Sequence, residues 1–401
     1  MKKWRLVYLG TLLPALAVGI GLWTPLSKAV AREGAKAPRF RVDPFWPKPL
    51  PVDPTQISPT TGKPKPWVTG EVGGTCIDSH DHVFTVNRAF QTGGLISPET
   101  VVAVPSPPVV EYDREGNVAN AWGSQEKNPD GSNKVMPNGI HGCFVDYQDN
   151  VWIAGNGDGV VQKWSHDGST RLLQIGTKGL CDGPVVAGAT MNPTCGNPGF
   201  NSSPKLLNEP ADLAVDPTNG DVYIADGYGN HRVIVFDKGG TFLRQWGSAG
   251  TGPGQFAAGD GGHPHCVVIS KAGLVYACDR GQDRIEVFTK DGTWLRDIPV
   301  RPGTGTPGLG TAGSAWDVDF SPDKNQTFMF EADGGNEILW IFSRATEKIL
   351  GGFGRPGHLA GEFTFLHTIA ADSKGNLFAG ETIGGRRIQK FVKAAGEGDE
   401  D

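Results

Sequence analysis

The sequence predicts an all-β fold, namely a six-bladed β-propeller of four-stranded antiparallel blades. Three observations predict it: one pattern recurs six times, each copy contains short runs of β-branched and aromatic residues, and turn-forming residues separate these runs. The chain of 401 residues contains 58 glycines and 30 prolines, which favours many short strands over long helices. A closed ring of such units leaves few exposed sheet edges.

Each repeat contains an apolar strand that ends near an Asp or Ser, a short turn, and a second apolar strand. The six copies start at Gly73, His141, Ala211, His265, Trp316 and His367. Most copies continue into a further hairpin, as in "RVIVFDKGGTFLRQWG". The sixth copy stops after "RRIQKFVKAAG" and is one strand short, so we expect "RFRVDPFWPK" from Arg39 to supply that strand and close the ring.

The segments outside the repeats complete the predicted domain organisation. Residues 1–31 combine a basic start, "MKKWR", with an apolar run and a small-residue end at Ala31, which predicts a cleaved signal peptide. An uncleaved membrane anchor is the alternative for this segment. Residues 32–67 form an N-terminal segment with the ring-closing strand, 68–393 the propeller, and 394–401 an acidic disordered tail. We therefore expect an exported protein, periplasmic or secreted.

The charge of the chain bears on its partners. A net charge of −6 implies no general attraction to nucleic acid or to an anionic membrane. We expect a monomer that takes a small-molecule or peptide substrate, with no membrane contact beyond an uncleaved signal anchor.

The six cysteines of an exported chain are expected to pair as disulfides. Sequence alone leaves all 15 connectivities open. We favour Cys181 with Cys195, because both lie in one loop-like insertion at 177–208.

Histidine occupies one position of the repeat in three of the six copies. Five residues before the Asp or Ser stand His141, His265 and His367, in copies two, four and six. Alternate blades of a six-bladed ring are roughly 120° apart, so these side chains are expected to meet at the axis. Three imidazoles with a fourth position open form the ligand set of a catalytic zinc site. Singly, each histidine could instead be a hydrogen-bonded residue at a strand start, and His263 is expected to be a loop residue.

Two aspartates directly follow the same column, in copies three and five. Asp212 and Asp317 could line the channel and help to bind a metal. The interpretation we favour is that they form hydrogen bonds at the start of the inner strand.

With this histidine column, residues 68 to 393 resemble the NHL-type propellers and, within them, the peptidyl-α-hydroxyglycine α-amidating lyases. The resemblance is closest at "EPADLAVDPTNGDVYIADGYGNHRVIVF" and "RQWGSAGTGPGQF". It implies that His141, His265 and His367 hold zinc. It also implies that Tyr228, in "ADGYGN", is the catalytic tyrosine and that Arg88, in "TVNRAF", is the essential arginine.

The activity implied by this resemblance is the cleavage of an N-acyl α-hydroxyglycine, a carbinolamide, to an amide and glyoxylate. Zinc would lower the pKa of the substrate hydroxyl, a tyrosine beside a cation could take the hydroxyl proton, and arginine suits the α-carboxylate. Tyr228 could instead be an aromatic residue of the rim, and Arg88 a surface charge at a strand end.

The chain departs from the family pattern at two positions. Thr368 replaces the aspartate that helps to hold the family's structural calcium, so calcium would depend on groups such as the Cys143 carbonyl. Gly229 replaces the cysteine beside the catalytic tyrosine.

Two other functions remain open from the sequence. The chain could be a non-catalytic NHL propeller that binds a protein or cell-envelope ligand and keeps the histidines around a structural metal. A propeller hydrolase of lactones or esters is disfavoured, because such enzymes bind their metal through carboxylate and amide oxygens, and the histidine column contains no carboxylate.

Overall fold

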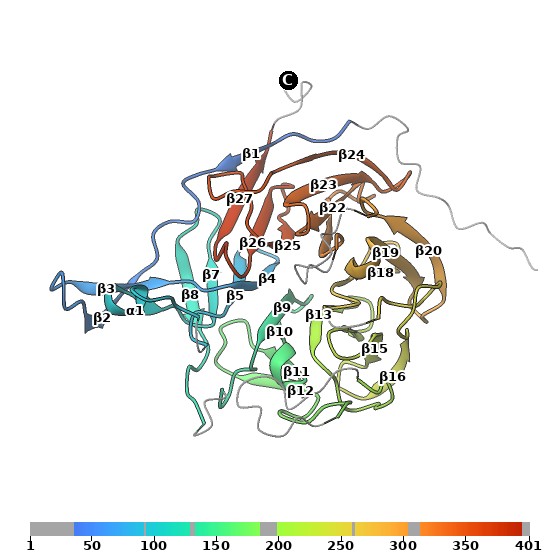
Figure 1. Cartoon of the computed structure of the whole chain (residues 1–401), viewed down its shortest axis with the longest axis horizontal. Coiled ribbons are helices and arrows are strands. Elements are labelled where there is room, and N and C mark those ends of the chain that lie inside the picture. Colours follow the sequence, from blue (N-terminus) through green and yellow to red (C-terminus); the bar gives the residue numbers. More distant parts are fainter. Residues whose placement is uncertain are drawn as a thin grey trace, which may run out of the picture.

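The described residues form a ring of sheets around a central axis (Figure 1). The computed structural model describes residues 36–91, 94–128, 133–184, 199–258, 261–303 and 313–394. Within these residues six four-stranded antiparallel sheets follow one another along the chain, which confirms the predicted six-bladed propeller. The predicted signal peptide lies outside the described residues, as does the tail after residue 394.

The first three blades follow the chain order from the innermost strand outward. Blade 1 consists of β4 (Val72–Ile77), β5 (Val83–Asn87), β7 (Val109–Tyr112) and β8 (Val118–Trp122). Blade 2 consists of β9 (Ile140–Val145), β10 (Val151–Gly155), β11 (Val160–Trp164) and β12 (Arg171–Ile175), with the 3-10 turn η1 (Asn156–Asp158). Blade 3 consists of β13 (Pro210–Val215), β14 (Val222–Asp226), β15 (Arg232–Phe236) and β16 (Phe242–Trp246).

The last three blades repeat this order. Blade 4 consists of β17 (Val267–Ile269), β18 (Leu274–Asp279), β19 (Arg284–Thr289) and β20 (Trp294–Pro299), with the 3-10 turn η2 (Arg280–Gln282). Blade 5 consists of β21 (Asp317–Phe320), β22 (Phe328–Asp333), β23 (Ile338–Ser343) and β24 (Lys348–Phe353). Blade 6 consists of β25 (Leu366–Ala371), β26 (Leu377–Glu381), β27 (Ile388–Lys393) and β1 (Phe40–Asp43).

Strand β1 closes the ring, as the sequence predicts. It pairs antiparallel with β27, with Phe40 opposite Lys393 and Val42 opposite Phe391. The Phe40 ring also packs edge-on against Phe330 of the neighbouring blade, with 5.8 Å between ring centroids. The N-terminal strand therefore covers the edge of β27 that blade 6 would otherwise leave unpaired.

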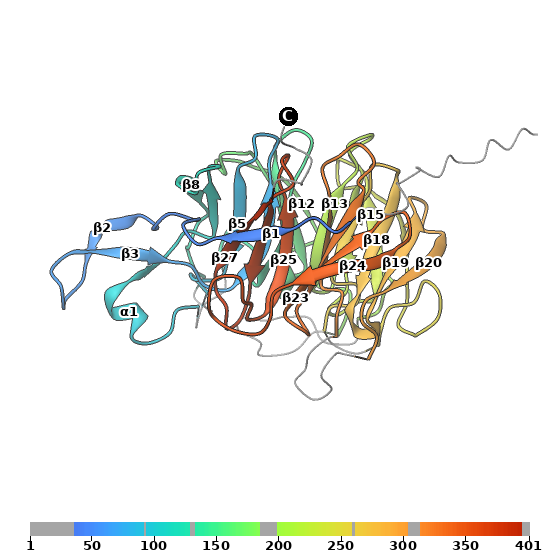
Figure 2. The same ribbon diagram turned by 90° about the horizontal axis from the view of Figure 1, so that it is seen from above.

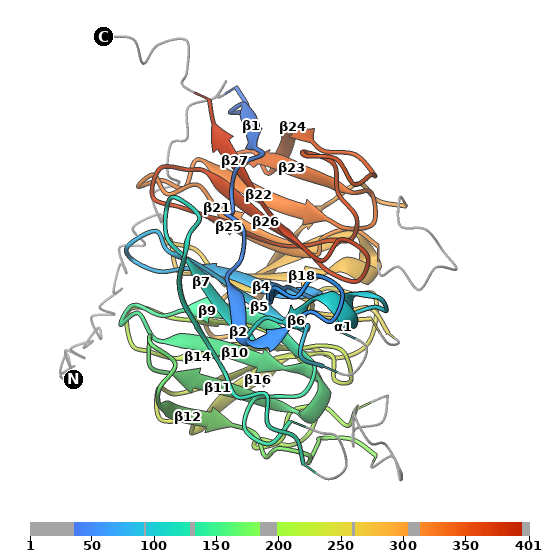
Figure 3. The ribbon, with the colours of Figure 1, turned by 90° about the vertical axis from the view of Figure 1, so that its left-hand side faces the viewer.

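A small sheet outside the ring was not predicted. It contains β2 (Val52–Ile57), β3 (Pro64–Val68) and β6 (Val104–Pro105), and β3 and β6 pair in parallel. With the short helix α1 (Glu99–Val102) it protrudes beside blade 1 (Figure 2), and Figure 3 views the molecule from that side. The mostly exposed β2 does not alternate between apolar and polar residues, so its sequence contains no recognisable strand pattern.

Burial explains the different residue patterns of the inner and outer strands of a blade. Every residue of the second strand is buried in blades 1, 2, 3 and 6, because both faces of that strand pack against neighbouring blades. The outermost strand alternates instead, as in β24 with its pattern of exposed and half-buried residues. Continuous apolar runs followed by alternating runs are therefore what the blade geometry requires.

Disulfides connect the inner parts of the ring. Cys76 of β4 is bonded to Cys143 of β9, and Cys266 to Cys278. Cys181 is also disulfide-bonded, and Cys195, its favoured partner, lies outside the described residues. Such bonds are typical of proteins in oxidising compartments. None of the helices in the described ranges has the length and apolar character needed to cross a bilayer.

Candidate metal centre in the channel

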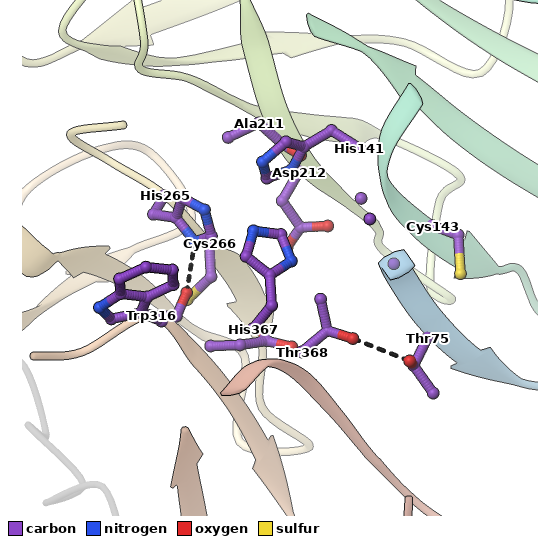
Figure 4. A pocket seen from close by; sticks show the side chains of 14 residues that line it. Thr75, His141, Cys143, Ala211, Asp212, His265, Cys266, Trp316, His367 and Thr368 are labelled. Carbon is purple, nitrogen blue, oxygen red and sulfur yellow. Dashed lines mark hydrogen bonds between the residues drawn. The ribbon is translucent and has the colours of Figure 1, made fainter. Parts of the chain in front are cut away.

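Three buried histidines converge at one end of the central channel (Figure 4). Their ring centroids lie 5.0 Å apart for His141 and His265, 4.7 Å for His141 and His367, and 4.9 Å for His265 and His367. One ring nitrogen from each lies within 4.8 Å of the other two. The structure therefore brings the three histidines of the sequence column together in a near-equilateral triangle.

The blade geometry places these side chains. His141 lies in β9, His367 lies in β25, and His265 directly precedes the short strand β17. All three stand at the channel end of an innermost strand, in alternate blades. Small residues line the same pocket from blade 1, where Gly73 and Gly74 pack so closely on blade 2 that a Cβ would lie 2.6 Å and 2.5 Å from its backbone.

Backbone carbonyls orient two of the imidazoles. His141 Nδ1 lies 2.7 Å from the Ala211 carbonyl oxygen, and His265 Nδ1 lies 2.6 Å from that of Trp316. An Nδ1–H that donates to a carbonyl leaves the Nε2 lone pair available for a metal. His265 Nε2 and His367 Nδ1 are buried and have no hydrogen-bond partner among the described residues. A metal ion would satisfy such nitrogens, so the donor set fits zinc.

The electrostatics favour neutral imidazoles. Burial lowers the pKa of His141 well below its usual value, and the charges of His367, Arg88 and Arg280 lower it further. Burial and the same two arginines lower the pKa of His367, and burial and Arg280 lower that of His265. Only a neutral imidazole can bind a metal, so protons compete weakly here.

Tyr228 lies beside the histidine triangle. Its hydroxyl oxygen is 3.1 Å from His141 Nε2, and its ring packs edge-on against both His141 and His265. Gly227, just before it, packs so tightly that a Cβ would lie 1.9 Å from the Pro264 carbonyl oxygen. This close contact positions the tyrosine turn against the loop that carries His265.

Arg280 completes the group, and it was not among the residues selected from the sequence. Its Nη2 donates to the Tyr228 hydroxyl at 3.0 Å, and its guanidinium lies 4.3 Å from the ring centroid of Trp316. Arg280 belongs to η2, a turn that follows β18 in the chain. Arg280 stands 15 residues after His265, just as Arg88 stands 15 residues after Gly73, so the repeat alignment could have identified it, but only the three-dimensional contacts show that it pairs with Tyr228.

Arg88 lies at the same end of the channel, directly after β5. Its Nε donates to the Ile140 carbonyl at 2.8 Å and its Nη1 to Glu71 Oε2 at 2.8 Å. Its side chain is 20 % exposed and its charge acts on both His141 and His367. The structure thus places Arg88 near the triangle, in an ion pair with Glu71.

The two aspartates of the column form the expected hydrogen bonds. Asp212 Oδ2 accepts from the Val267 amide at 3.2 Å, and Asp317 Oδ2 accepts from the Ile369 amide at 2.9 Å. Burial raises the pKa of Asp212 to about 7, and burial with the charge of Asp212 raises that of Asp317 well above its usual value. Both link neighbouring inner strands and also line a cavity of about 300 Å³ farther along the channel.

Two other residues singled out in the sequence lie close by. The Thr368 hydroxyl donates to Thr75 Oγ1 at 2.8 Å, which joins β25 to β4. His263 is a loop residue, as expected, but it is buried. Its Nδ1 accepts from the Gly281 amide at 3.2 Å, and burial lowers its pKa to about 3.

Comparisons with known proteins support the propeller fold. The NHL repeat family model matches residues 207–236, from just before β13 to the end of β15. Human NHL repeat-containing protein 3 is 28% identical over 306 residues, 71% of this chain and 73% of that protein.

Two further relatives are named as amidating enzymes. Peptidyl-α-hydroxyglycine α-amidating lyase 1 of Drosophila melanogaster is 25% identical over 322 residues, 75% of this chain and 50% of the fly protein. The mouse peptidyl-glycine α-amidating monooxygenase is 30% identical over 244 residues, 55% of this chain and 21% of the mouse protein. The chain is thus a β-propeller that matches the NHL repeat model in its third blade and is similar both to NHL repeat-containing protein 3 and to an α-hydroxyglycine amidating lyase.

Proposed function

We propose that this protein is an exported, zinc-dependent lyase that cleaves an N-acyl α-hydroxyglycine to an amide and glyoxylate. The observation that carries the proposal is the triangle of His141, His265 and His367 with the Tyr228 and Arg280 pair beside it. The similarity to amidating lyases supports the same reaction class.

The reaction needs three tasks from the site. The hydroxyl proton of the substrate must leave, the C–N bond must break as the aldehyde carbonyl of glyoxylate forms, and the departing amide nitrogen must gain a proton. A zinc ion held by the three imidazoles would act as a Lewis acid toward the substrate hydroxyl. The remaining tasks fall to side chains of the chain itself.

Tyr228 is the candidate base. Its hydroxyl lies 3.1 Å from His141 Nε2, so a substrate hydroxyl at the triangle is within reach of proton transfer to Tyr228. Negative charge on the phenol oxygen is stabilised by Arg280, which donates to it at 3.0 Å. The proton can then pass from Tyr228 to the departing amide nitrogen, so that protons balance over the cycle.

Arginines near the triangle suit the carboxylate of the substrate. Arg88 and Arg280 place two positive charges close to His141 and His367. A guanidinium is well suited to binding a carboxylate through its N–H donors, and Arg88 Nη1 already donates one hydrogen bond to a carboxylate, that of Glu71. We assign Arg88 to binding of the substrate carboxylate.

The test uses purified protein without the first 31 residues. Zinc is measured by elemental analysis, and glyoxylate release is followed from a simple N-acyl α-hydroxyglycine. We expect zinc in the channel and glyoxylate release that stops on chelation and returns when zinc is added back. Zinc without any glyoxylate release would refute the lyase proposal.

A second function has its own support, because human NHL repeat-containing protein 3 matches over 71% of this chain. On this alternative the channel metal clamps blades 2, 4 and 6, and the protein binds a protein or cell-envelope ligand without catalysis. The two functions differ in one measurement: a clamp predicts that metal removal lowers the melting temperature with no turnover to lose.

A further inference from the structure

A second group of metal-ligating side chains lies far from the channel histidines. Asp78 directly follows β4, His82 directly precedes β5, Glu111 lies in β7, and His166 lies in the turn between β11 and β12. Gly73, at the other end of β4, lines the pocket of the channel histidines. Because a strand rises about 3.3 Å per residue, Asp78 lies about 16 Å from Gly73.

The donor atoms of this group lie within about 1 Å of the spacing expected between ligands of one zinc ion, and the two shortest pairs are closer because they are hydrogen-bonded. Glu111 Oε1 lies 2.6 Å from His82 Nδ1, and Asp78 Oδ2 lies 3.0 Å from His166 Nε2 and 4.0 Å from His82 Nδ1. One donor atom each of Asp78, His82 and Glu111 lies within 4.8 Å of the other two. Donors about 2.1 Å from a tetrahedral zinc ion are about 3.4 Å from one another.

The surroundings hold these groups in place. Asp78 Oδ1 accepts from the backbone amides of His80 and His82, both at 2.8 Å, which turns Oδ2 toward the imidazoles. The His166 ring packs edge-on against Phe84, which is fully buried, with 5.3 Å between ring centroids. The carboxylates lie inside, with Asp78 at 0 % and Glu111 at 5 % side-chain exposure, while His82 and His166 are 31 % and 38 % exposed.

The charge balance points to a divalent cation. In the described part of the chain, the ion-pair partners of the Asp78 and Glu111 carboxylates are histidines, without any lysine or arginine. Buried carboxylates need a charged partner or a metal. A divalent ion could enter from solvent past the partly exposed imidazoles of His82 and His166. Its charge would balance those of the two carboxylates.

We propose that Asp78, His82, Glu111 and His166 form a second metal site that binds zinc or a similar divalent transition-metal ion. Two imidazoles select such an ion over calcium or magnesium, which prefer oxygen ligands throughout. The ion would connect blades 1 and 2 at the end of β4 that lies away from the channel histidines. This site does not depend on the proposed lyase activity.

The first experiment measures zinc stoichiometry in the full mature chain after loading and removal of excess metal. We expect two zinc ions per native chain, one in His265→Ala and one in the double variant His82→Gln/His166→Gln. His358→Gln is the matched control, because it removes an exposed histidine of the blade 6 side and is expected to keep both ions. Circular dichroism and metal-free melting temperatures check that each variant folds.

Two results would overturn the second site. One is a folded double variant that binds as much zinc as the native chain, which would leave the group as a hydrogen-bonded ion cluster. The other needs no variant: crystals of the zinc-loaded native protein, measured at the zinc absorption edge, show a channel peak but no anomalous peak among the four side chains. If the native protein shows an anomalous peak among the four side chains but none at the channel histidines, the lyase site is refuted and the second site is not.

Discussion

Replacement of Tyr228 by phenylalanine separates a catalytic tyrosine from a structural one. The change removes the hydroxyl that lies 3.1 Å from His141 Nε2 and 3.0 Å from Arg280 Nη2, and keeps the ring that packs on both histidines. If Tyr228 moves the substrate proton, kcat should fall by about 10²- to 10⁴-fold. That loss corresponds to about 3 to 5 kcal/mol of transition-state stabilisation.

The chain offers a matched control in Tyr223. Its hydroxyl also accepts from an arginine, Arg244 Nη2 at 2.6 Å, and it donates to the Lys290 carbonyl at 3.2 Å. Loss of a hydrogen bond to a charged group costs about 1.5 to 3 kcal/mol of stability, so both Tyr→Phe variants should be destabilised to a similar degree. Only Tyr228→Phe should lose turnover.

The assay follows glyoxylate release at saturating substrate, with zinc content and urea unfolding measured on the same preparations. Equal zinc content in the two variants ensures that a change in kcat is not a change in metal. The reasoning is refuted if Tyr228→Phe keeps more than a tenth of native turnover. It is equally refuted if Tyr223→Phe loses as much turnover as Tyr228→Phe.

Three further predictions follow from named contacts. Arg280→Lys keeps the positive charge but loses the planar fork that reaches the Tyr228 hydroxyl, so we expect a drop of about tenfold in kcat at unchanged zinc content. Removal of the Cys76–Cys143 disulfide by paired Cys→Ser changes opens a loop of 67 residues, which should cost about 4 kcal/mol in urea unfolding; an unchanged midpoint would contradict this. Burial raises the pKa of Asp319 to about 6, so the folded state keeps a proton that the unfolded chain releases, and this carboxyl's contribution to stability is lost as pH rises through 6. Asp319→Asn does not titrate and should gain about 3 kcal/mol relative to the native chain between pH 4 and pH 8, whereas parallel pH profiles would disprove the assignment.

Much of the fold could be predicted from the sequence because the repeat reflects the blade. The inner strands read as apolar runs that end near Asp or Ser, since each is enclosed by two neighbours in the ring. The missing strand of blade 6 and its replacement by β1 also followed from counting strands. The β2, β3 and β6 sheet could not be predicted, because its exposed strands contain no apolar periodicity.

The candidate site likewise contains residues that the sequence predicted and residues that only the structure revealed. The three histidines share one repeat position, so periodicity alone aligned them, and the structure brings them within 5.0 Å of one another. Arg280 shares a repeat position with Arg88, but its contact with Tyr228 follows from no repeat position, and neither do the contacts around Asp78. These contacts form only because turns of neighbouring blades come together in the folded ring, blades 3 and 4 for Tyr228 and Arg280, and blades 1 and 2 for Asp78 and His166.

The sequence by itself determined the number of blades, the closure of the ring and the histidine triangle, because a closed ring converts a linear period into angles around one axis. The tertiary structure alone decided which cations stand beside Tyr228, which cysteines pair, and that two buried carboxylates of blade 1 face His82 of the same blade and His166 of blade 2. These contacts join residues without a common period, so their distances depend on how loops pack and not on any pattern along the chain.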